Sequence, residues 1–194
     1  MIDLKFQDGI ARLLAVMAAL LVVFGGDCLG QASTSEEGRN PFHGYSAGPE
    51  GARAILKDLM KGDVDRRALT LALRPRSQDY ASVFTPEVVE IVEARYAALW
   101  NSSPPVVIAP KEGQTELLLW SATTEALRNH TGMAKEFPGG YRGATPYLKD
   151  GLIWYRFKFV EPGMRIGMAY DGLVHVNGRW CWFPKSWRVL PKNR

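Results

Sequence analysis

The pair Asn177-Gly178 constrains this chain more than any other feature, because it separates two short runs that read as β-strands. Both central residues of a type I′ hairpin turn need a positive φ, which Asn and Gly tolerate best. The pair therefore predicts an antiparallel hairpin with Val174 opposite Cys181 and His175 opposite Trp180. Neighbouring residues of a strand point to opposite faces, so this register keeps His175 and Cys181 from forming a nucleophile and base pair.

A second turn is expected to extend this hairpin into a three-stranded sheet between Leu152 and Pro184. The segment Glu161 to Met164 reads as a type II turn, in which Pro162 presets φ and Gly163 takes a positive φ. That turn predicts Phe157 opposite Met168, and it brings apolar residues onto one face, which we expect to form the core. The predicted core face consists of Tyr155, Phe157, Phe159, Met164, Ile166, Met168, Tyr170, Val174, Val176, Cys181 and Phe183.

The opposite face of the predicted sheet is chemically mixed and is the candidate site. Small residues, Gly167 and Ala169, leave room on it for cations and indole rings to meet a ligand. Such groups suit an anionic small molecule or the acidic edge of a protein partner, and the alternative is an ordinary solvated sheet face. The predicted ligand-binding residues are Trp154, Arg156, Lys158, Arg165, Asp171, His175, Trp180 and Trp182.

Three helices are expected before the sheet. Pro49 to Gly62 has a proline start and a glycine stop, and Asp63 to Leu73 begins with a capping residue. Gln78 to Phe84 is expected to be a connection. Thr85 to Trp100 carries apolar residues at helical spacing after a Thr-Pro-Glu start, which predicts the third helix.

The middle of the chain is less regular. Val106 to Ala109 and Thr115 to Trp120 read as strands, and Thr123 to Asn129 reads as one or two helical turns. Thr131 to Asp150 is rich in Gly and Pro and has no period. A connection of this length is either functional, for example as a lid, or loose.

Helices followed by strands predict an α+β fold, with N-terminal helices packed on a curved antiparallel sheet of about five strands. This order, from Pro49 to Pro184, resembles the NTF2-like fold and the steroid isomerases and dehydratases that share it. The resemblance rests on element order, so no functional residue is carried over. It implies a pocket between sheet and helices, on the face where Tyr155 and Tyr170 supply the polar groups.

The N-terminus resembles a targeting signal. Leu13 to Phe24 is an uninterrupted apolar run, with Lys5 and Arg12 before it and the small-x-small sequence Gly30-Gln31-Ala32 after it. A transmembrane helix needs about 20 apolar residues, so cleavage and export to the periplasm or medium are expected instead. Residues 1–32 are then a signal peptide, and no membrane span follows its removal.

Cys28 raises the alternative of a lipoprotein, because a cysteine just after an apolar run can be lipidated. Without lipidation, cleavage after Ala32 would leave only Cys181, which cannot form an internal disulfide. Residues 33–48 are polar and read as a flexible leader. Residues 49–194 have the length of a single α+β domain.

Charge and motifs exclude several classes of function. The net charge is +4, from 24 Lys and Arg against 20 Asp and Glu scattered along the chain, which argues against nucleic-acid binding. No catalytic constellation, metal-ligand spacing or cofactor motif is found, so no catalytic residue, metal or cofactor is predicted. The sequence favours an exported binding or interaction module. The alternatives are an NTF2-like isomerase or dehydratase and a structural envelope protein.

Overall fold

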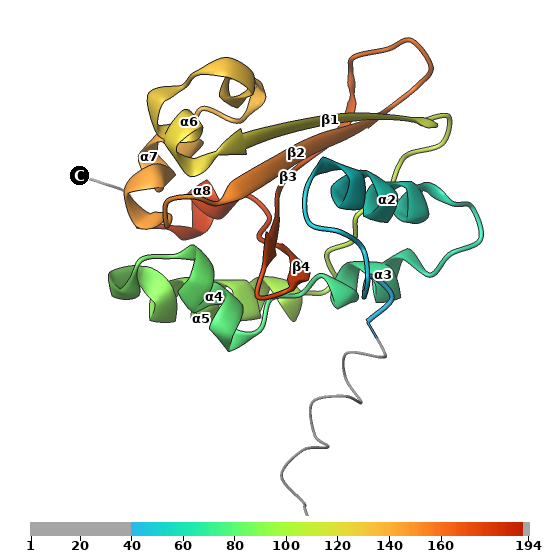
Figure 1. Cartoon of the computed structure of the whole chain (residues 1–194). Helices are drawn as coiled ribbons and strands as arrows, with labels where there is room; N and C mark the ends of the chain where they lie inside the picture. The colour runs from blue at the N-terminus through green and yellow to red at the C-terminus, as the bar shows by residue number, and fades with distance from the viewer. Residues whose placement is uncertain (1–39, 192–194) are drawn as a thin grey trace, which may run out of the picture. The chain divides into compact units, whose positions relative to one another are not determined.

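The computed structural model describes residues 40–191, so the predicted signal peptide and Cys28 lie outside the described residues (Figure 1). The described part has an α+β fold, made of helices and one four-stranded antiparallel sheet in the order β1-β2-β3-β4. No helix within residues 40–191 is both long enough and apolar enough to cross a membrane.

The first predicted helix is confirmed, the third is an α-helix only from Val89 to Trp100 after a 3-10 turn at Pro86–Val88, and two local predictions upstream of the sheet are wrong. Asp65, not Asp63, caps the second helix by accepting a hydrogen bond from the Ala68 amide at 2.9 Å. The segment predicted as a connection is helical, because Asp79 in its first turn accepts from the Arg76 amide at 2.8 Å. The elements are α2 (Pro49–Met60), α3 (Arg66–Ala72), α4 (Ser77–Val83), η1 (Pro86–Val88) and α5 (Val89–Trp100).

The sheet has four strands instead of about five, because residues 106–109 do not join it. Side chains, instead of a neighbouring strand, form hydrogen bonds with the backbone of this segment. Ile108 N donates to Thr70 Oγ1 at 3.0 Å, and the Tyr170 hydroxyl accepts from the Ala109 amide and donates to the Ala109 carbonyl. The remaining elements are β1 (Glu116–Thr123), α6 (Thr124–Asn129), η2 (Gly132–Glu136), α7 (Tyr141–Ala144), η3 (Thr145–Tyr147), β2 (Ile153–Val160), β3 (Gly167–Val176), β4 (Arg179–Trp182) and α8 (Ser186–Val189).

The hairpin between β3 and β4 forms as predicted. Asn177 and Gly178 have φ values of 51° and 71°, as a type I′ turn requires. Val174 lies opposite Cys181 and His175 opposite Trp180, so the register is confirmed.

The predicted register between β2 and β3 is wrong by two residues. Phe157 lies opposite Tyr170 instead of Met168, because the connection between the strands is longer than the expected turn. Met164 and Ile166 therefore lie in this connection, where they are 52% and 84% exposed, and they do not belong to the core.

A β-bulge at Gly172 then reverses which residues share a face. Arg156 pairs with Asp171 and Tyr155 pairs with Leu173, which leaves Gly172 without a partner. Gly172 has φ +91°, and a Cβ there would lie 1.9 Å from the Phe183 carbonyl oxygen, so only glycine fits. Beyond the bulge, every side chain of β3 lies on the face opposite to the predicted one.

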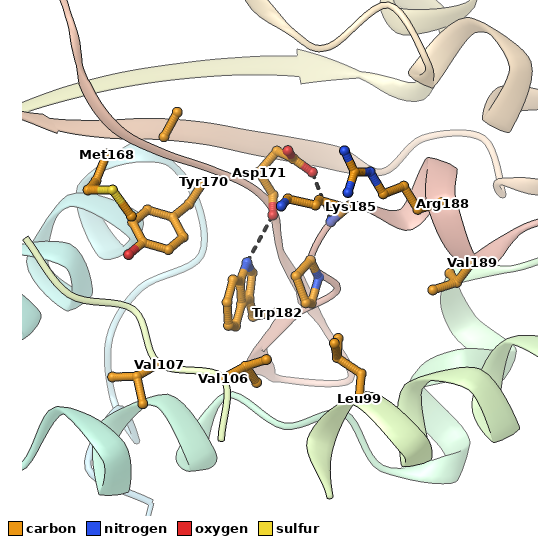
Figure 2. A pocket seen from close by; sticks show the side chains of 12 residues that line it. Leu99, Val106, Val107, Met168, Tyr170, Asp171, Trp182, Lys185, Arg188 and Val189 are labelled. Carbon is orange, nitrogen blue, oxygen red and sulfur yellow. Dashed lines mark hydrogen bonds between the residues drawn. The ribbon is translucent and has the colours of Figure 1, made fainter. Parts of the chain in front are cut away.

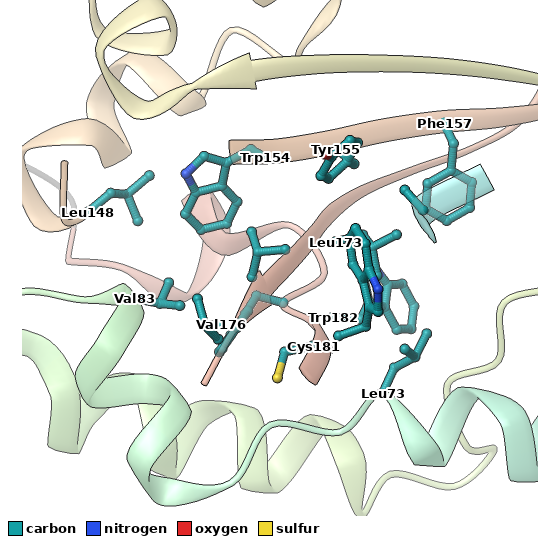
Figure 3. Close-up of a cluster of buried hydrophobic side chains, with 14 of the residues drawn as sticks. Leu73, Val83, Leu148, Trp154, Tyr155, Phe157, Leu173, Val176, Cys181 and Trp182 are labelled. Atoms are coloured by element: carbon teal, nitrogen blue, oxygen red, sulfur yellow. The ribbon is translucent and has the colours of Figure 1, made fainter. Parts of the chain in front are cut away.

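The buried core is rich in aromatic rings, of which Trp154, Tyr155, Phe157 and Trp182 are labelled in Figure 3. The Phe183 ring lies 5.4 Å from the ring of Tyr80 and 5.8 Å from that of Tyr96, and Trp100 packs edge-on against Trp182. Cys181 is fully buried, as predicted, and burial raises the pKa of its thiol, which keeps it protonated.

The segment between α6 and β2 is a packed cover instead of a loose connection. Phe137, Tyr141 and Leu148 of this segment are buried, and the Tyr141 ring lies 5.9 Å from the Trp154 ring in an edge-on contact. Both faces of the sheet are therefore covered around Trp154.

Part of the predicted leader also contacts the domain. Phe42 is only 4% exposed and belongs to the core, and the Tyr45 hydroxyl donates to Asp58 Oδ2 at 2.5 Å. The described stretch from Asn40 to Gly48 is thus tied to α2.

Candidate functional site

The structure divides seven of the eight predicted ligand-binding residues between two faces of the sheet and places Arg165 outside it, in the connection between β2 and β3. Because of the bulge, His175, Trp180 and Trp182 share the face of Tyr155. The prediction that all of these residues share one face of the sheet is therefore wrong. Several of them nevertheless lie at the surfaces described below. The predicted residues on the other face are Trp154, Arg156, Lys158 and Asp171.

The three tryptophans among these residues are core side chains. Trp154, Trp180 and Trp182 are 0%, 1% and 3% exposed. Trp154 Nε1 donates to Thr124 Oγ1 at 3.1 Å, and Trp182 Nε1 donates to the Asp171 carbonyl at 2.9 Å. Their N–H groups are thus used inside the protein, apart from that of Trp180, which has no hydrogen-bond partner within the described residues.

His175 is half-buried against Trp180, with ring centroids 5.2 Å apart. Burial lowers the pKa of this imidazole, which favours its neutral form. No group of three or more His, Cys, Asp or Glu side chains within residues 40–191 could hold a metal ion. His175 is therefore best understood as a packing residue.

A pocket lies at the edge of the sheet where β4 has ended and β3 continues (Figure 2). β4 pairs only with Leu173 to Val176, so Gly167 to Asp171 has no strand neighbour on that side. The chain turns away after Pro184, and Lys185 takes a left-handed conformation with φ 50°. The resulting space has a volume of about 440 Å³.

The pocket walls are mainly apolar and come from four separate segments. Leu99 lies in the last turn of α5, Val106 and Val107 belong to the segment 106–109 that does not join the sheet, Tyr170 and Trp182 come from the sheet, and Val189 comes from α8. Figure 2 shows these side chains around the space, with Asp171, Lys185 and Arg188 grouped on one side of it. The full lining is Leu99, Val106, Val107, Met168, Ala169, Tyr170, Asp171, Trp182, Pro184, Lys185, Arg188 and Val189.

Asp171 is the buried polar group of this pocket. It is 7% exposed, and its Oδ1 accepts from the Tyr141 hydroxyl and from the Lys185 amide, each at 3.0 Å. Burial raises the pKa of the Asp171 carboxyl above its usual value, although these two hydrogen bonds and the charge of Arg156 oppose that shift.

Two exposed cations, Lys185 and Arg188, lie beside Asp171 at the pocket. The Arg188 guanidinium lies over the Trp187 ring, with its central carbon 4.8 Å from the ring centroid. Neither cation forms an ion pair with a carboxylate of the described chain. The charge of Lys185 acts on the neighbouring Asp171 carboxyl, whereas Arg188 has no carboxylate partner within the described residues.

The sequence predicted Asp171 and Trp182 as site residues and missed the other members of this pocket. Lys185 and Arg188 follow the last strand in a basic and aromatic tract, Lys-Ser-Trp-Arg, which was the only local signal. Tyr141 lies in the segment that had no recognisable pattern, so its bond to Asp171 could not be found from spacing.

The other predicted cations gather elsewhere, around Trp120 of β1. The Arg156 guanidinium carbon and the Lys158 Nζ lie 5.8 Å and 5.6 Å from the Trp120 ring centroid. Lys158 Nζ also donates to the Arg165 carbonyl at 3.2 Å. Trp120 was not predicted as a site residue, because its pairing with Arg156 depends on the β1–β2 register.

Comparison of the chain with protein-family models, curated proteins and solved structures gives no significant match.

Proposed function

We propose that the pocket beside β3 binds a small molecule with an apolar body and one anionic group. The observation that carries this proposal is that the apolar walls meet two cations, Lys185 and Arg188, that are not paired within the described chain. A volume of about 440 Å³ also lies within the usual range of ligand pockets, roughly 300 to 1,000 Å³.

The apolar body of the ligand would lie between Leu99 and Val106 on one side and Tyr170 and Trp182 on the other. Burying apolar ligand surface contributes about 25 cal/mol per Å², and the flat Trp182 indole favours a ring or a chain laid against it.

The anionic group would lie against Lys185 and Arg188, where a charge-assisted hydrogen bond contributes about 1.5 to 3 kcal/mol. Asp171 lies on the inner side of these cations. Its Oδ1 is held by the Tyr141 hydroxyl and the Lys185 amide, and burial raises the pKa of its carboxyl.

A binding assay with simple carboxylates tests this proposal. Octanoate and phenylpropionate, with their primary amides as uncharged controls, would be titrated while thermal stability and tryptophan fluorescence are measured. We expect the carboxylates to bind and Arg188→Ala to weaken binding at least about tenfold. Arg67→Ala, an exposed arginine on α3, is the matched control and should not change binding.

Val107→Trp provides an independent test, because it fills the pocket without removing a charge. Binding that survives this change, or equal binding of acids and amides, would exclude the pocket as an anion site. Failure of every carboxylate to bind would favour the alternative of a structural envelope protein.

The proposed compartment is outside the cytoplasm, on the basis of the targeting signal in residues 1–32. Intact-mass measurement of the native product is expected to show a chain that begins at Ser33. Retention of Met1, or a lipid on Cys28, would contradict this.

An acid–base enzyme is the second candidate, favoured by the buried carboxyl of Asp171 beside the Tyr141 hydroxyl. The resemblance to NTF2-like isomerases and dehydratases points to the same chemistry, which needs a proton donor or acceptor in a pocket. Mass spectrometry of ligands after incubation distinguishes the candidates. An enzyme would convert a ligand and lose conversion in Asp171→Asn while keeping binding, whereas a binding module would return every ligand unchanged.

A further inference from the structure

We infer that the outer edge of β1, together with the cations around Trp120, docks an extended acidic segment of a partner protein as an added strand. This inference concerns the opposite edge of the sheet from the β3 pocket and does not depend on the proposed ligand.

The outer edge of β1 has no strand neighbour, although η2 and α2 also contact this strand. β1 is the first strand of the sheet and pairs only with β2 (Figure 1). Within residues 40–191, the backbone of Leu117 to Ala122 makes no backbone hydrogen bond outside that pairing. Such an edge offers a row of N–H and C=O groups to which an extended peptide can add.

The side chains of β1 do not protect this edge. Natural edge strands usually carry Lys, Pro or a bulge that prevents pairing with another chain. The eight residues of β1 contain no Lys, Arg or Pro, and the β1–β2 pairing runs without a bulge. Leu117, Leu118, Leu119 and Trp120 are all half-buried, so apolar surface is available on both sides of the edge.

A hollow of about 300 Å³ follows this edge. It is lined by Leu117 to Trp120, by Arg53 of α2 and by Arg165 of the β2–β3 connection. The strand edge and two cations thus line the same space.

Charge identifies the partner as acidic. Arg156 and Lys158 lie near the Trp120 ring, and Lys158 Nζ bonds to the Arg165 carbonyl. None of these three, and not Arg53, forms an ion pair with a carboxylate of the described chain, although the charge of Arg156 also acts on Asp171, its neighbour on β3. Like charges gathered on one patch of sheet are unfavourable unless an anion lies among them.

The unpaired strand edge favours a peptide over another kind of anion. A phosphate surface could use the cations, but it would leave the backbone groups of Leu117 to Trp120 unpaired. Glu116, at the start of β1, does not neutralise the cluster, because its Oε2 accepts from the Gly163 amide at 3.1 Å.

The probe for this surface is a fluorescein-labelled peptide that alternates glutamate and valine and matches the eight residues of β1. Anisotropy titration is expected to show binding that weakens as salt is raised. The same peptide methylated on every backbone nitrogen keeps its side chains and charge but loses its donors, and it should bind at least tenfold more weakly. A lysine and valine peptide should not bind.

Charge reversal locates the site. Arg165→Glu and Arg53→Glu should each weaken binding of the probe at least tenfold, whereas Arg67→Glu on α3 should leave it unchanged. Circular dichroism verifies that each variant is folded. Hydrogen exchange tests the same site in the parent protein, without any substitution. The outward amides of β1 should exchange more slowly when the probe is bound.

The inference is overturned if the methylated peptide or anionic phospholipid vesicles bind as tightly as the probe, because the surface would then attract any anion. It is also overturned if Arg67→Glu has the same effect as Arg165→Glu, or if a folded parent protein binds no probe. None of these results bears on carboxylate binding beside Arg188, so the two proposals fail separately.

Discussion

Arg179 Nη1 donates a hydrogen bond to Asp79 Oδ2 at 2.6 Å, joining two residues that are 100 positions apart in the sequence. Asp79 is fully buried, and the Arg179 side chain is 13% exposed. Asn177 Nδ2 donates to the same carboxylate at 2.8 Å, so the turn of the β3–β4 hairpin is anchored to α4. Asp79 also accepts from the Arg76 amide, which starts that helix.

Removal of this buried pair is expected to destabilise the fold. Asp79→Ala leaves the Arg179 charge without its partner, and breaking a buried pair costs about 3 to 5 kcal/mol. Urea denaturation followed by tryptophan fluorescence measures the change. Glu112→Ala, in an exposed turn, is the control and should change stability by less than about 0.5 kcal/mol.

Because of the Asp79 carboxylate, the stability of the fold is expected to decrease in acid. Burial alone would raise the pKa of Asp79, but the hydrogen bonds from Arg76, Asn177 and Arg179 together lower it below the usual aspartate pKa of 3.8. Stability from this group is therefore present above pH 3.8 and is lost as the pH falls through the lower folded-state pKa. Acid titration of Asp79→Asn should show a smaller loss in that range, and an identical loss would contradict this role.

Asp171 is expected to affect the pH dependence of stability in the opposite direction. Because burial raises its folded-state pKa, ionised Asp171 costs stability, and this cost grows as the pH rises above the unfolded-state value. Asp171→Asn should gain stability relative to the parent as the pH rises above about 4, and the gain should level off above the raised folded-state pKa. Urea midpoints across this range measure the gain. A difference in stability between Asp171→Asn and the parent that does not change with pH would contradict a raised pKa for Asp171.

Gly172 is expected to tolerate no side chain. Gly172→Ala forces a Cβ against the Phe183 carbonyl at a φ of +91°, which should cost about 2 kcal/mol or more. Gly139→Ala is the matched control, because its φ is not positive and a Cβ there meets nothing within 4 Å. Equal stability of the two variants would rule out the bulge.

Cys181 is expected to be unreactive in the folded protein, because it is fully buried and the pKa of its thiol is raised by burial. A Cys28→Ser variant leaves Cys181 as the remaining thiol, since the chain has two cysteines. Labelling with a thiol reagent should require denaturant. Rapid labelling under native conditions would contradict the predicted burial.

Local sequence was sufficient for those elements whose cause lies within a few residues. Asn177-Gly178 determined the β3–β4 register because a type I′ turn depends on the φ values of its own two residues. The helices α2 and α5 followed from their starts and apolar spacing. The separation of His175 from Cys181 followed from the pleat of a single strand pair.

Tertiary structure decided which side chains form sites. The bulge at Gly172 depends on Phe183, whose amide donates to the Gly172 carbonyl at 2.8 Å, and this contact divided the predicted mixed face. The first turn of α4 depends on Asp79, which is held by Arg179 from 100 residues away. The β3 pocket and the edge of β1 likewise combine segments that meet only after the sheet has formed. Turn chemistry is local and can be read from neighbouring residues, whereas bulges, buried ion pairs and pockets depend on contacts between distant segments.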